Sequence, residues 1–466
     1  MKKIILSILL ISAVSCRDFL VNEPVESISI NTQLSTKKGM LEALNAVYYR
    51  LSTTYFSEAV FSYGDLLSGN LKFSPKSTGA VGIPTNVDDI YNFDDISTSS
   101  NLANFYSESY QIINNINLIL DYAGNLPDAT PEEISEIKAE TLALRAFVHF
   151  QLYKYYGQNY TYTSDASHLG IAYNTAPLKV GVDYPGRKTV AETFTLLEND
   201  ISEALSLIQQ QHAIPTGLDK NYIRPAAIKT IAAEIALWKN DWQKAYEYSN
   251  DVISNSGISL TPKSELVSNW AFSESIWELP KDYNNDFPAS RLYSLTNTST
   301  PLYVASDDLY NLYASNDLRK NLFDAKNIKT TGITTAPTYY FTKKYKGNVN
   351  SLIYRLSLLY FIRAEAAFKT GNTNQALLDI NTIRNRAGLS SLTSVSTDLI
   401  LEEKRREFPF ENEYFFDLMR NHKNIVRING CISSNCSPSY PNVKFVAPVP
   451  QNAVNLNSNI KQNPGY

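Results

Sequence analysis

Apolar residues recur at helical spacing along much of the chain. Stripes with the i, i+3, i+4, i+7 pattern of amphipathic helices occupy residues 40–51, 102–120 and 190–208. Long polar stretches separate the apolar segments and cover residues 68–100, 157–188, 255–350 and 421–466. Loops of this length in a compact protein usually carry function or short additional structure. The pattern therefore predicts a helical scaffold whose binding surface is formed by insertions.

Part of the helical pattern repeats. One block begins at Ala233-Glu234 and another at Ala364-Glu365, and in both an alanine follows the glutamate eleven residues later. A weaker third copy begins at Ala139-Glu140, with 189–208 as its partner helix. Small residues at fixed positions let two antiparallel helices pack closely, as in tetratricopeptide repeats. Ordinary helical hairpins that happen to share alanines are the alternative. We predict a mainly α fold: a tetratricopeptide-like helical-repeat core with long irregular loop insertions and little β structure.

The first residues are typical of an export signal. Lys2 and Lys3 precede an apolar run from Ile4 to Val14, which is too short to span a bilayer as a helix. Cys16 stands at the expected cleavage point, as a bacterial lipoprotein signal requires. We therefore expect 1–15 to be removed and Cys16 to carry acyl chains that anchor the protein to a membrane. An ordinary cleaved signal with an incidental Cys16 is the alternative.

Composition narrows the classes of function. A net charge of −4 and a pI near 5.8 argue against nucleic-acid binding. Because the chain has only 4 histidines, metal and acid–base sites built on imidazole are scarce, and we predict no metal and no cofactor. Its 31 tyrosines offer apolar faces with polar tips, which suit flat ligands. Cys431 and Cys436 are spaced for a small disulfide in an exported protein, with two free thiols as the alternative.

Motifs for catalysis are missing from the sequence. Gly64 to Gly69 has the spacing of a phosphate-binding loop, but Asn70 stands where the lysine is needed. Paired aspartates at 88–89, 94–95 and 307–308 could flank a glycosidic bond, although adjacent aspartates in polar loops are usually solvated turns or helix caps. We therefore predict that the protein is not an enzyme. An exported glycan-degrading enzyme and a helical-repeat scaffold for protein interactions are the alternatives.

Several segments have a characteristic order along the chain. They are Cys16–Leu20 with Pro24, Phe105–Leu120, Ala139–Tyr156, 187–208, the paired-helix units Arg224–Ile253 and Leu358–Gly388, Pro448–Pro450 and Lys461–Tyr466. In this order and spacing the chain resembles the SusD/RagB family of outer-membrane lipoproteins for nutrient capture. The resemblance covers essentially the whole mature chain, and it implies binding without turnover.

One segment departs from the family pattern. Members typically have Glu-Gly and then an Arg-aromatic pair before Asp-Leu-x-Arg, whereas this chain has Asn412 in place of the glycine and Tyr414 in place of the arginine. Asn412 can still adopt a left-handed conformation, so we expect the turn to survive. Tyr414 leaves one charge partner missing. We expect the charged residues of this region to form a structural salt-bridge network: Arg405, Arg406, Glu407, Glu411, Asp417 and Arg420.

The resemblance also implies an organisation and a role. It predicts a single domain over 16–466, with an N-terminal half of about 16–220, a C-terminal half of about 221–466, and ligand-binding insertions at about 64–100 and 255–350. Family members are expected to sit as a lid over a SusC-like TonB-dependent barrel transporter. This protein would then face the exterior of the outer membrane, capture an oligosaccharide or a peptide, and pass it to that transporter.

Individual ligand contacts are predicted from the two insertions, chiefly 64–100 and 270–300. Tyr91 and either Tyr283 or Tyr293 would stack on the ligand. The predicted polar contacts are Asp65, Asn70 and Asn92. The alternative for each is a loop residue packed on its own scaffold. The four tryptophans, Trp238, Trp242, Trp270 and Trp277, are expected in the core.

Overall fold

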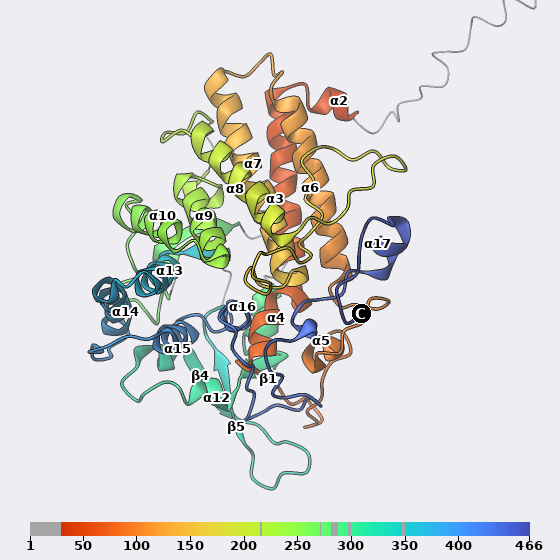
Figure 1. Cartoon of the computed structure of the whole chain (residues 1–466). Coiled ribbons are helices and arrows are strands. Elements are labelled where there is room, and N and C mark those ends of the chain that lie inside the picture. Colours follow the sequence, from red (N-terminus) through yellow and green to blue (C-terminus); the bar gives the residue numbers. More distant parts are fainter. Residues whose placement is uncertain (1–28, 215–216, 271, 281–287, 297–299, 347–349) are drawn as a thin grey trace, which may run out of the picture.

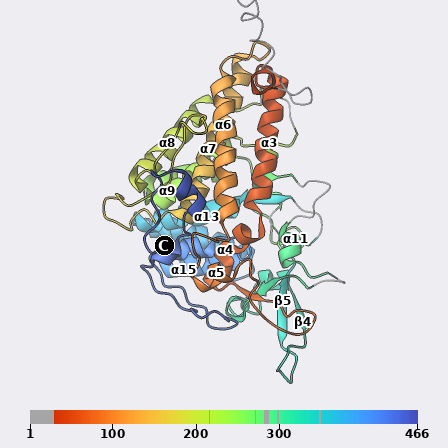
Figure 2. The same cartoon turned by 90° about the vertical axis from the view of Figure 1, so that its right-hand side faces the viewer.

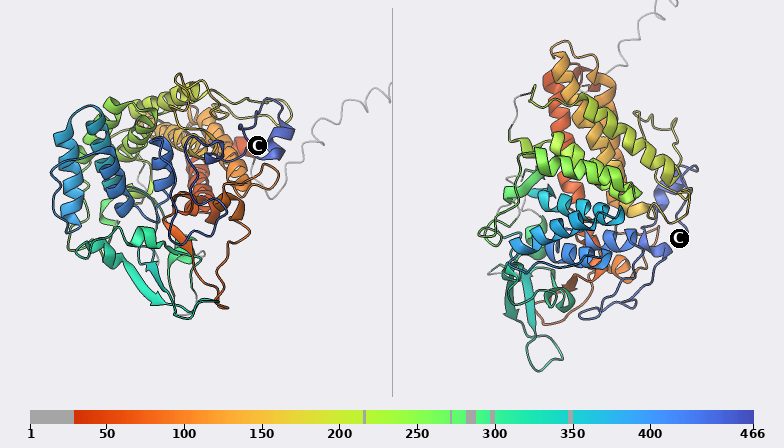
Figure 3. Two further views of the ribbon diagram at one scale, coloured as in Figure 1. Left: turned by 60° about the horizontal axis from the view of Figure 1, so that its bottom comes forward. Right: turned by 60° about the vertical axis from the view of Figure 1, so that its left-hand side comes forward.

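Long helices make up most of the molecule. The computed structural model describes residues 29–466 apart from 215–216, 271, 281–287, 297–299 and 347–349 (Figure 1). The long helices are α3 (Lys37–Tyr55), α6 (Ala103–Ala123), α7 (Pro131–Tyr156), α8 (Val190–Leu207), α9 (Pro225–Lys239), α10 (Trp242–Asn255), α13 (Leu356–Lys369), α14 (Thr373–Arg386) and α15 (Thr397–Glu407). In this order each helix packs on the next, so that successive pairs lie side by side (Figure 3).

Local sequence sets several helix ends. Thr130 and Thr189 begin α7 and α8 with capping boxes, in which a glutamate three residues later bonds back to the backbone of the capping residue. Asn240 ends α9 in a left-handed conformation and leads directly into α10. The turn at Asn240 allows α9 and α10 to form a closely packed hairpin.

The predicted helical repeat is confirmed by three hairpins, α7–α8, α9–α10 and α13–α14. The repeated glutamates are all buried, each facing a partner outside its own hairpin. Glu140 accepts a hydrogen bond from Tyr48, Glu234 pairs with Lys154 at 3.0 Å, and Glu365 pairs with Arg420 at 2.7 Å. The shared glutamate position therefore links each hairpin to a neighbouring part of the scaffold.

Shorter elements gather mainly at one end of the helical array (Figures 1 and 2). The short helices are α2 (Ile30–Gln33), α4 (Glu58–Ser68), α5 (Asp88–Asn92), α11 (Pro288–Tyr293), α12 (Asp307–Tyr310), α16 (Tyr414–Arg420) and α17 (Gln451–Leu456). Single 3₁₀ turns are η1 (Asp219–Asn221), η2 (Phe272–Glu274), η3 (Leu318–Leu322) and η4 (Val443–Phe445). The strands are β1 (Leu71–Phe73), β2 (Ser275–Leu279), β3 (Tyr303–Ala305), β4 (Phe323–Asn327), β5 (Thr338–Thr342) and β6 (Ser351–Arg355).

The β structure consists of two small antiparallel sheets among the described residues. One has the order β1-β3-β5-β4, and the other pairs β2 with β6. The main hydrophobic core contains residues from both halves of the chain. Trp238, Trp270 and Trp277 lie in this core as expected, while Trp242 is partly buried against it. None of the helices in the described ranges is long and apolar enough to cross a membrane.

Candidate ligand-binding site

The two predicted insertions form one continuous surface. Strand β1 of the first insertion pairs with β3 of the second, so that Leu71 lies opposite Ala305. Backbone hydrogen bonds of 2.8 Å extend this contact, from Ser306 N–H to Asn70 C=O and from Thr331 N–H to Gly79 C=O. We call this surface the loop face; it comprises the described residues of 71–100 and 288–345. It lies at the lower end of the molecule in Figure 1.

Asp65 and Asn70 lie beneath the loop face and are fully buried. The Asp65 carboxylate accepts hydrogen bonds from Asn70 Nδ2 at 2.8 Å and from the Asn412 backbone N–H at 2.7 Å. Asn70 Oδ1 in turn accepts from Arg405 Nε at 2.7 Å. Burial raises the pKa of Asp65 to about 6, although the hydrogen bonds from Asn70 and Asn412 oppose this increase. The prediction that these two residues contact a ligand is corrected: they brace the interior.

Tyr91 and Asn92 hold a C-terminal loop rather than forming an open platform. Cys431 and Cys436 are joined by a disulfide that closes this loop. The buried Tyr91 hydroxyl accepts a hydrogen bond from Ile432 N–H at 3.2 Å, and Arg427 lies over the Tyr91 ring at 4.5 Å. Asn92 Oδ1 accepts from the side chain of Ser433 in the same loop at 2.8 Å. The stacking role predicted for Tyr91 is therefore corrected, whereas Asn92 is half-buried at the edge of the loop face.

The two remaining predicted aromatics have different outcomes. Tyr283 lies outside the described residues. Tyr293 is fully buried, with its ring 5.8 Å from that of Tyr345 and 5.2 Å from that of Phe410, so its predicted role as a stacking residue is corrected as well. Tyr91 and Tyr293 are buried for the same reason, because the insertions contribute these side chains to the main hydrophobic core.

A half-exposed aromatic pair on the loop face was missed from sequence. Tyr310 of α12 and Tyr340 of β5 stack with ring centroids 3.4 Å apart and an interplanar angle of 9°. Lys320 Nζ lies 4.9 Å from the centre of the Tyr310 ring. Alternation within β5 could have indicated Tyr340, because the neighbouring Tyr339 and Phe341 point inward and Tyr340 points the other way. Its pairing with Tyr310 depends on tertiary structure.

The predicted charge network exists, and its centre is Arg355 at the end of β6. Arg355 Nη1 contacts Glu274 at 2.7 Å and Glu407 at 2.8 Å, while Nε contacts Glu411 at 2.8 Å. Burial by itself would raise the pKa of Glu407, but the charges of the arginines around it, Arg386, Arg355 and Arg319, hold that pKa well below its usual range.

Other members of the predicted network pair in part with each other and in part with residues that the sequence did not indicate. Asp417 pairs with Lys404 at 2.8 Å and with Arg420 at 3.2 Å. Arg406 pairs with the helix residues Glu402 and Glu403. Arg405 was expected in an ion pair; among the described residues it instead bonds Asn70 and lies 4.6 Å from the ring centre of Tyr414. The tyrosine that replaces the family arginine thus receives a cation–π contact. The turn at Asn412 is left-handed as predicted, with φ of 65°.

The paired aspartates have structural partners. Asp307 pairs with Lys72 at 2.7 Å, and Asp308 accepts hydrogen bonds from the backbone N–H groups of Ile428 and Asn429. Asp95 is buried and accepts a hydrogen bond from Ser100. Asp307 and Asp308 therefore connect distant segments, whereas Asp95 stabilises its own loop. Within the part of the chain that the structure describes, no group of three or more histidine, cysteine, aspartate or glutamate side chains is arranged to hold a metal ion.

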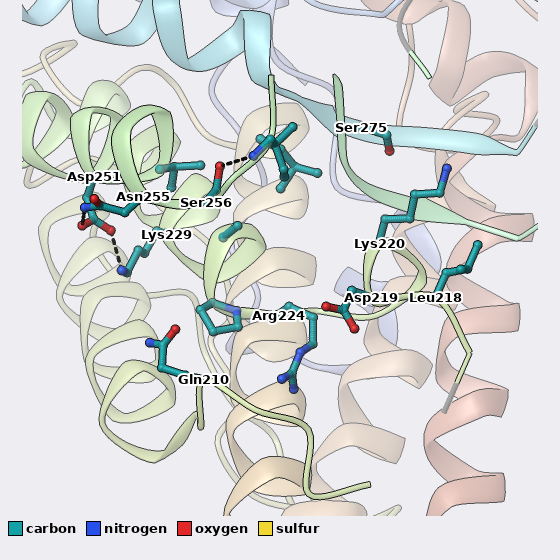
Figure 4. Close-up of a pocket in the computed structure, with 15 residues that line it drawn as sticks. Gln210, Leu218, Asp219, Lys220, Arg224, Lys229, Asp251, Asn255, Ser256 and Ser275 are labelled. Atoms are coloured by element: carbon teal, nitrogen blue, oxygen red, sulfur yellow. Dashed lines mark hydrogen bonds and ion pairs between the residues drawn. The ribbon is translucent and has the colours of Figure 1, made fainter. Parts of the chain in front are cut away.

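A cavity of about 550 Å³ lies away from the loop face (Figure 4). Residues of η1, α9, α10 and β2 line it, and charged side chains are prominent among them. These charges already have partners: Lys229 pairs with Asp251 and Lys220 with Glu278. The cavity is large enough for a small ligand, but its cations do not need a ligand to balance them.

Comparison with known protein families accounts for most of the chain. Residues 268–466 match the family model described as "SusD family", and residues 63–233 match the model "Starch-binding associating with outer membrane". The chain is SusD-like over both of these segments. A curated relative from Bacteroides ovatus, a SusD-like protein, is 21% identical over 87% of this chain and 79% of the relative.

Solved structures of SusD-family proteins have the same fold. A SusD superfamily protein from Bacteroides thetaiotaomicron aligns with a TM-score of 0.80 and 26% identity, covering 92% of this chain and 100% of that one. A putative sugar binding protein from Bacteroides vulgatus aligns with a TM-score of 0.81 and 22% identity, covering 93% of this chain and 100% of that one.

Proposed function

We propose that this protein is a cell-surface receptor that binds an oligosaccharide on its loop face and delivers it to a TonB-dependent outer-membrane transporter. The observation that carries the proposal is the pairing of β1 with β3, which joins the two insertions into one surface. The structurally similar protein from Bacteroides vulgatus is known as a putative sugar binding protein, which supports a carbohydrate ligand. The name of the matching family model, which includes starch binding and the outer membrane, supports both the ligand class and the location.

The loop face offers the chemistry that a glycan needs. Tyr310 and Tyr340 supply half-exposed rings for the apolar faces of sugar units, and Asn92 supplies a half-buried amide elsewhere on the loop face. Of the ligand contacts predicted from sequence, we retain Asn92 and Tyr283 in the proposed site. We add Tyr310 and Tyr340.

The first experiment measures ligand binding. Soluble protein beginning at Arg17 is mixed with a panel of oligosaccharides and peptides, bound ligands are quantified by calorimetry, and the mixture is examined by mass spectrometry. We expect an intact oligosaccharide to bind. If a peptide binds and no oligosaccharide does, the proposed ligand class is wrong. If the glycan is cleaved, the receptor proposal is overturned in favour of an enzyme.

Variants locate the site. Removing one stacking ring costs about 1 kcal/mol, so Tyr340→Ala and Tyr310→Ala should each weaken glycan binding about fivefold. Tyr49→Ala removes an exposed ring from α3 in the helical array and is the matched control. Unchanged affinity in both loop-face variants would exclude the stacked pair from the site.

A second experiment tests the anchor and the partner. In a cell that makes the full chain, we propose that Cys16 is acylated and that the protein co-purifies with a large outer-membrane barrel. Cys16→Ser should remove the lipid mass and release the protein from the membrane fraction. Membrane retention of Cys16→Ser, or purification without a barrel protein, would contradict this part of the proposal.

A further inference from the structure

A second cleft lies on the opposite side of the scaffold from the cavity in Figure 4. Its volume is about 500 Å³, and it lies between α6, the segment 172–185 and α17, which come together at the right of Figure 1. Most of its lining is aromatic or aliphatic and includes Tyr106, Tyr110, Leu178, Tyr184, Leu456 and Ile460. Neither predicted insertion contributes a wall, so this cleft is separate from the loop face.

One polar side chain in this lining has an unused hydrogen-bonding atom. Asn174 is 6% exposed, and its Oδ1 is buried without a hydrogen-bond partner. Leaving a buried amide oxygen unpaired costs free energy, so the position calls for an explanation. Asn174 also lines the cleft, so a rotation of its side-chain amide is the movement that would present this oxygen to a ligand there.

The backbone of Asn174 is held firmly in place. Its N–H donates to His149 Nε2 at 3.1 Å, and its C=O accepts from Asn117 Nδ2 at 3.1 Å. Burial lowers the pKa of His149 to about 3, so the ring is neutral and can accept this hydrogen bond. The side-chain oxygen, by contrast, has no hydrogen-bond partner among the described residues.

The cleft favours an uncharged ligand. Of the Asp, Glu, Lys, Arg and His residues that the structure describes, only Asp183 lines the cleft. Its carboxylate accepts a hydrogen bond from the backbone N–H of Lys179 at 2.7 Å. The other polar side chains of the lining are Asn104, Ser107, Asn452 and Asn457, and they stand among mostly apolar residues, which offer an oligosaccharide few hydrogen-bonding partners. Tyrosine rings on the wall favour a flat aromatic partner.

We propose that this cleft binds a neutral aromatic ring carrying one hydroxyl group, with the ring against Tyr106 and Tyr110 and the hydroxyl donating to Asn174 Oδ1. This site is additional to the proposed glycan site and does not depend on it. A pocket with apolar walls and one buried polar group is the usual form of a small-molecule site.

Two probes that differ in one donor test the proposal. Binding of 4-methylphenol and of 4-methylanisole, which cannot donate, is measured by ligand-observed NMR on the intact mature chain. The native protein should bind 4-methylphenol about fivefold more tightly, because the hydrogen bond contributes roughly 1 kcal/mol. In Asn174→Leu this preference should disappear. Asn255→Leu makes the same substitution at the cavity of Figure 4, and this control variant should keep the preference for 4-methylphenol.

A second variant keeps the test decisive if Asn174→Leu does not fold. Ala453 lines the cleft from α17 and is only partly buried, so Ala453→Trp should fill the cleft and abolish binding of both probes. The proposal is overturned if the native protein does not bind 4-methylphenol at millimolar concentration. It is also overturned if Asn174→Leu keeps the preference, if a folded Ala453→Trp protein binds as the native protein does, or if oligosaccharides displace the phenol.

Discussion

The backbone N–H of Asn412 donates a 2.7 Å hydrogen bond to the buried carboxylate of Asp65, although the two residues lie 347 positions apart. The Asn412 side chain adds two bonds, accepting from Gly64 N–H at 2.5 Å and donating to the Tyr155 hydroxyl at 2.8 Å. Asn412 thus fastens the C-terminal turn to α4 and α7. Because α4 leads directly into β1, this junction also positions the loop face.

Replacing Asn412 should destabilise the protein by two separable effects. Asn412→Ala leaves Gly64 N–H without its buried partner and places alanine in a left-handed conformation, for a total of about 2–4 kcal/mol. Asn412→Gly loses the same side-chain bonds without the conformational cost, so it should be about 1 kcal/mol more stable than Asn412→Ala. Urea unfolding measures both. Equal stability of the two variants would argue against the left-handed turn.

The raised pKa of Asp65 predicts a pH-dependent stability. Because the folded-state pKa is about 6 and the ordinary value is 3.8, the folded state holds the proton more tightly. The resulting stabilisation is fully present below about pH 4 and is lost as the pH rises through about 6. The free energy of unfolding of the native protein, minus that of Asp65→Asn, should therefore fall by about 2 kcal/mol between about pH 4 and pH 7. A difference independent of pH would contradict the raised pKa.

Removing Arg355 should have a large effect on stability. Arg355→Met leaves Glu274, Glu407 and Glu411 short of a buried cation, and breaking a buried ion pair from one side costs about 3–5 kcal/mol. Lys38→Met removes the exposed pair with Glu42 and is the control, for which little change is expected. Thermal and urea unfolding compare the two. Similar stability of the two variants would show that the network is not a structural centre.

The disulfide should stabilise the loop that covers Tyr91. It closes a loop with a sequence separation of 5, for which the chain-entropy model gives about 2 kcal/mol. The double variant Cys431→Ser/Cys436→Ser should lose about this much in urea unfolding, and reduction of the native protein should reproduce the loss. Alkylation without reductant distinguishes a disulfide from two free thiols. Labelling of both cysteines in the native protein would show that the thiols are free and would contradict the prediction.

Short-range patterns predicted the scaffold well. The apolar stripes at 40–51, 102–120 and 190–208 correspond to α3, α6 and α8, and the repeated Ala-Glu blocks lie in packed hairpins. Such features are visible in one sequence because helix periodicity and capping depend on residues within a few positions of one another. The left-handed turn at Asn412 was predicted differently, from the glycine that the family resemblance implies at this position and from the tolerance of asparagine for that conformation.

The candidate site was less accessible to this reasoning. Asp65, Asn70, Tyr91 and Tyr293 were placed correctly in or beside the insertions, yet the fold turns them inward, while the outward pair of Tyr310 and Tyr340 was not singled out. By itself, then, the sequence determined the helical repeat and the polar stretches that interrupt it, because these depend on local periodicity and local composition. Only the tertiary structure decided which loop side chains are buried and which face solvent, because in irregular segments that choice is made by contacts between residues hundreds of positions apart.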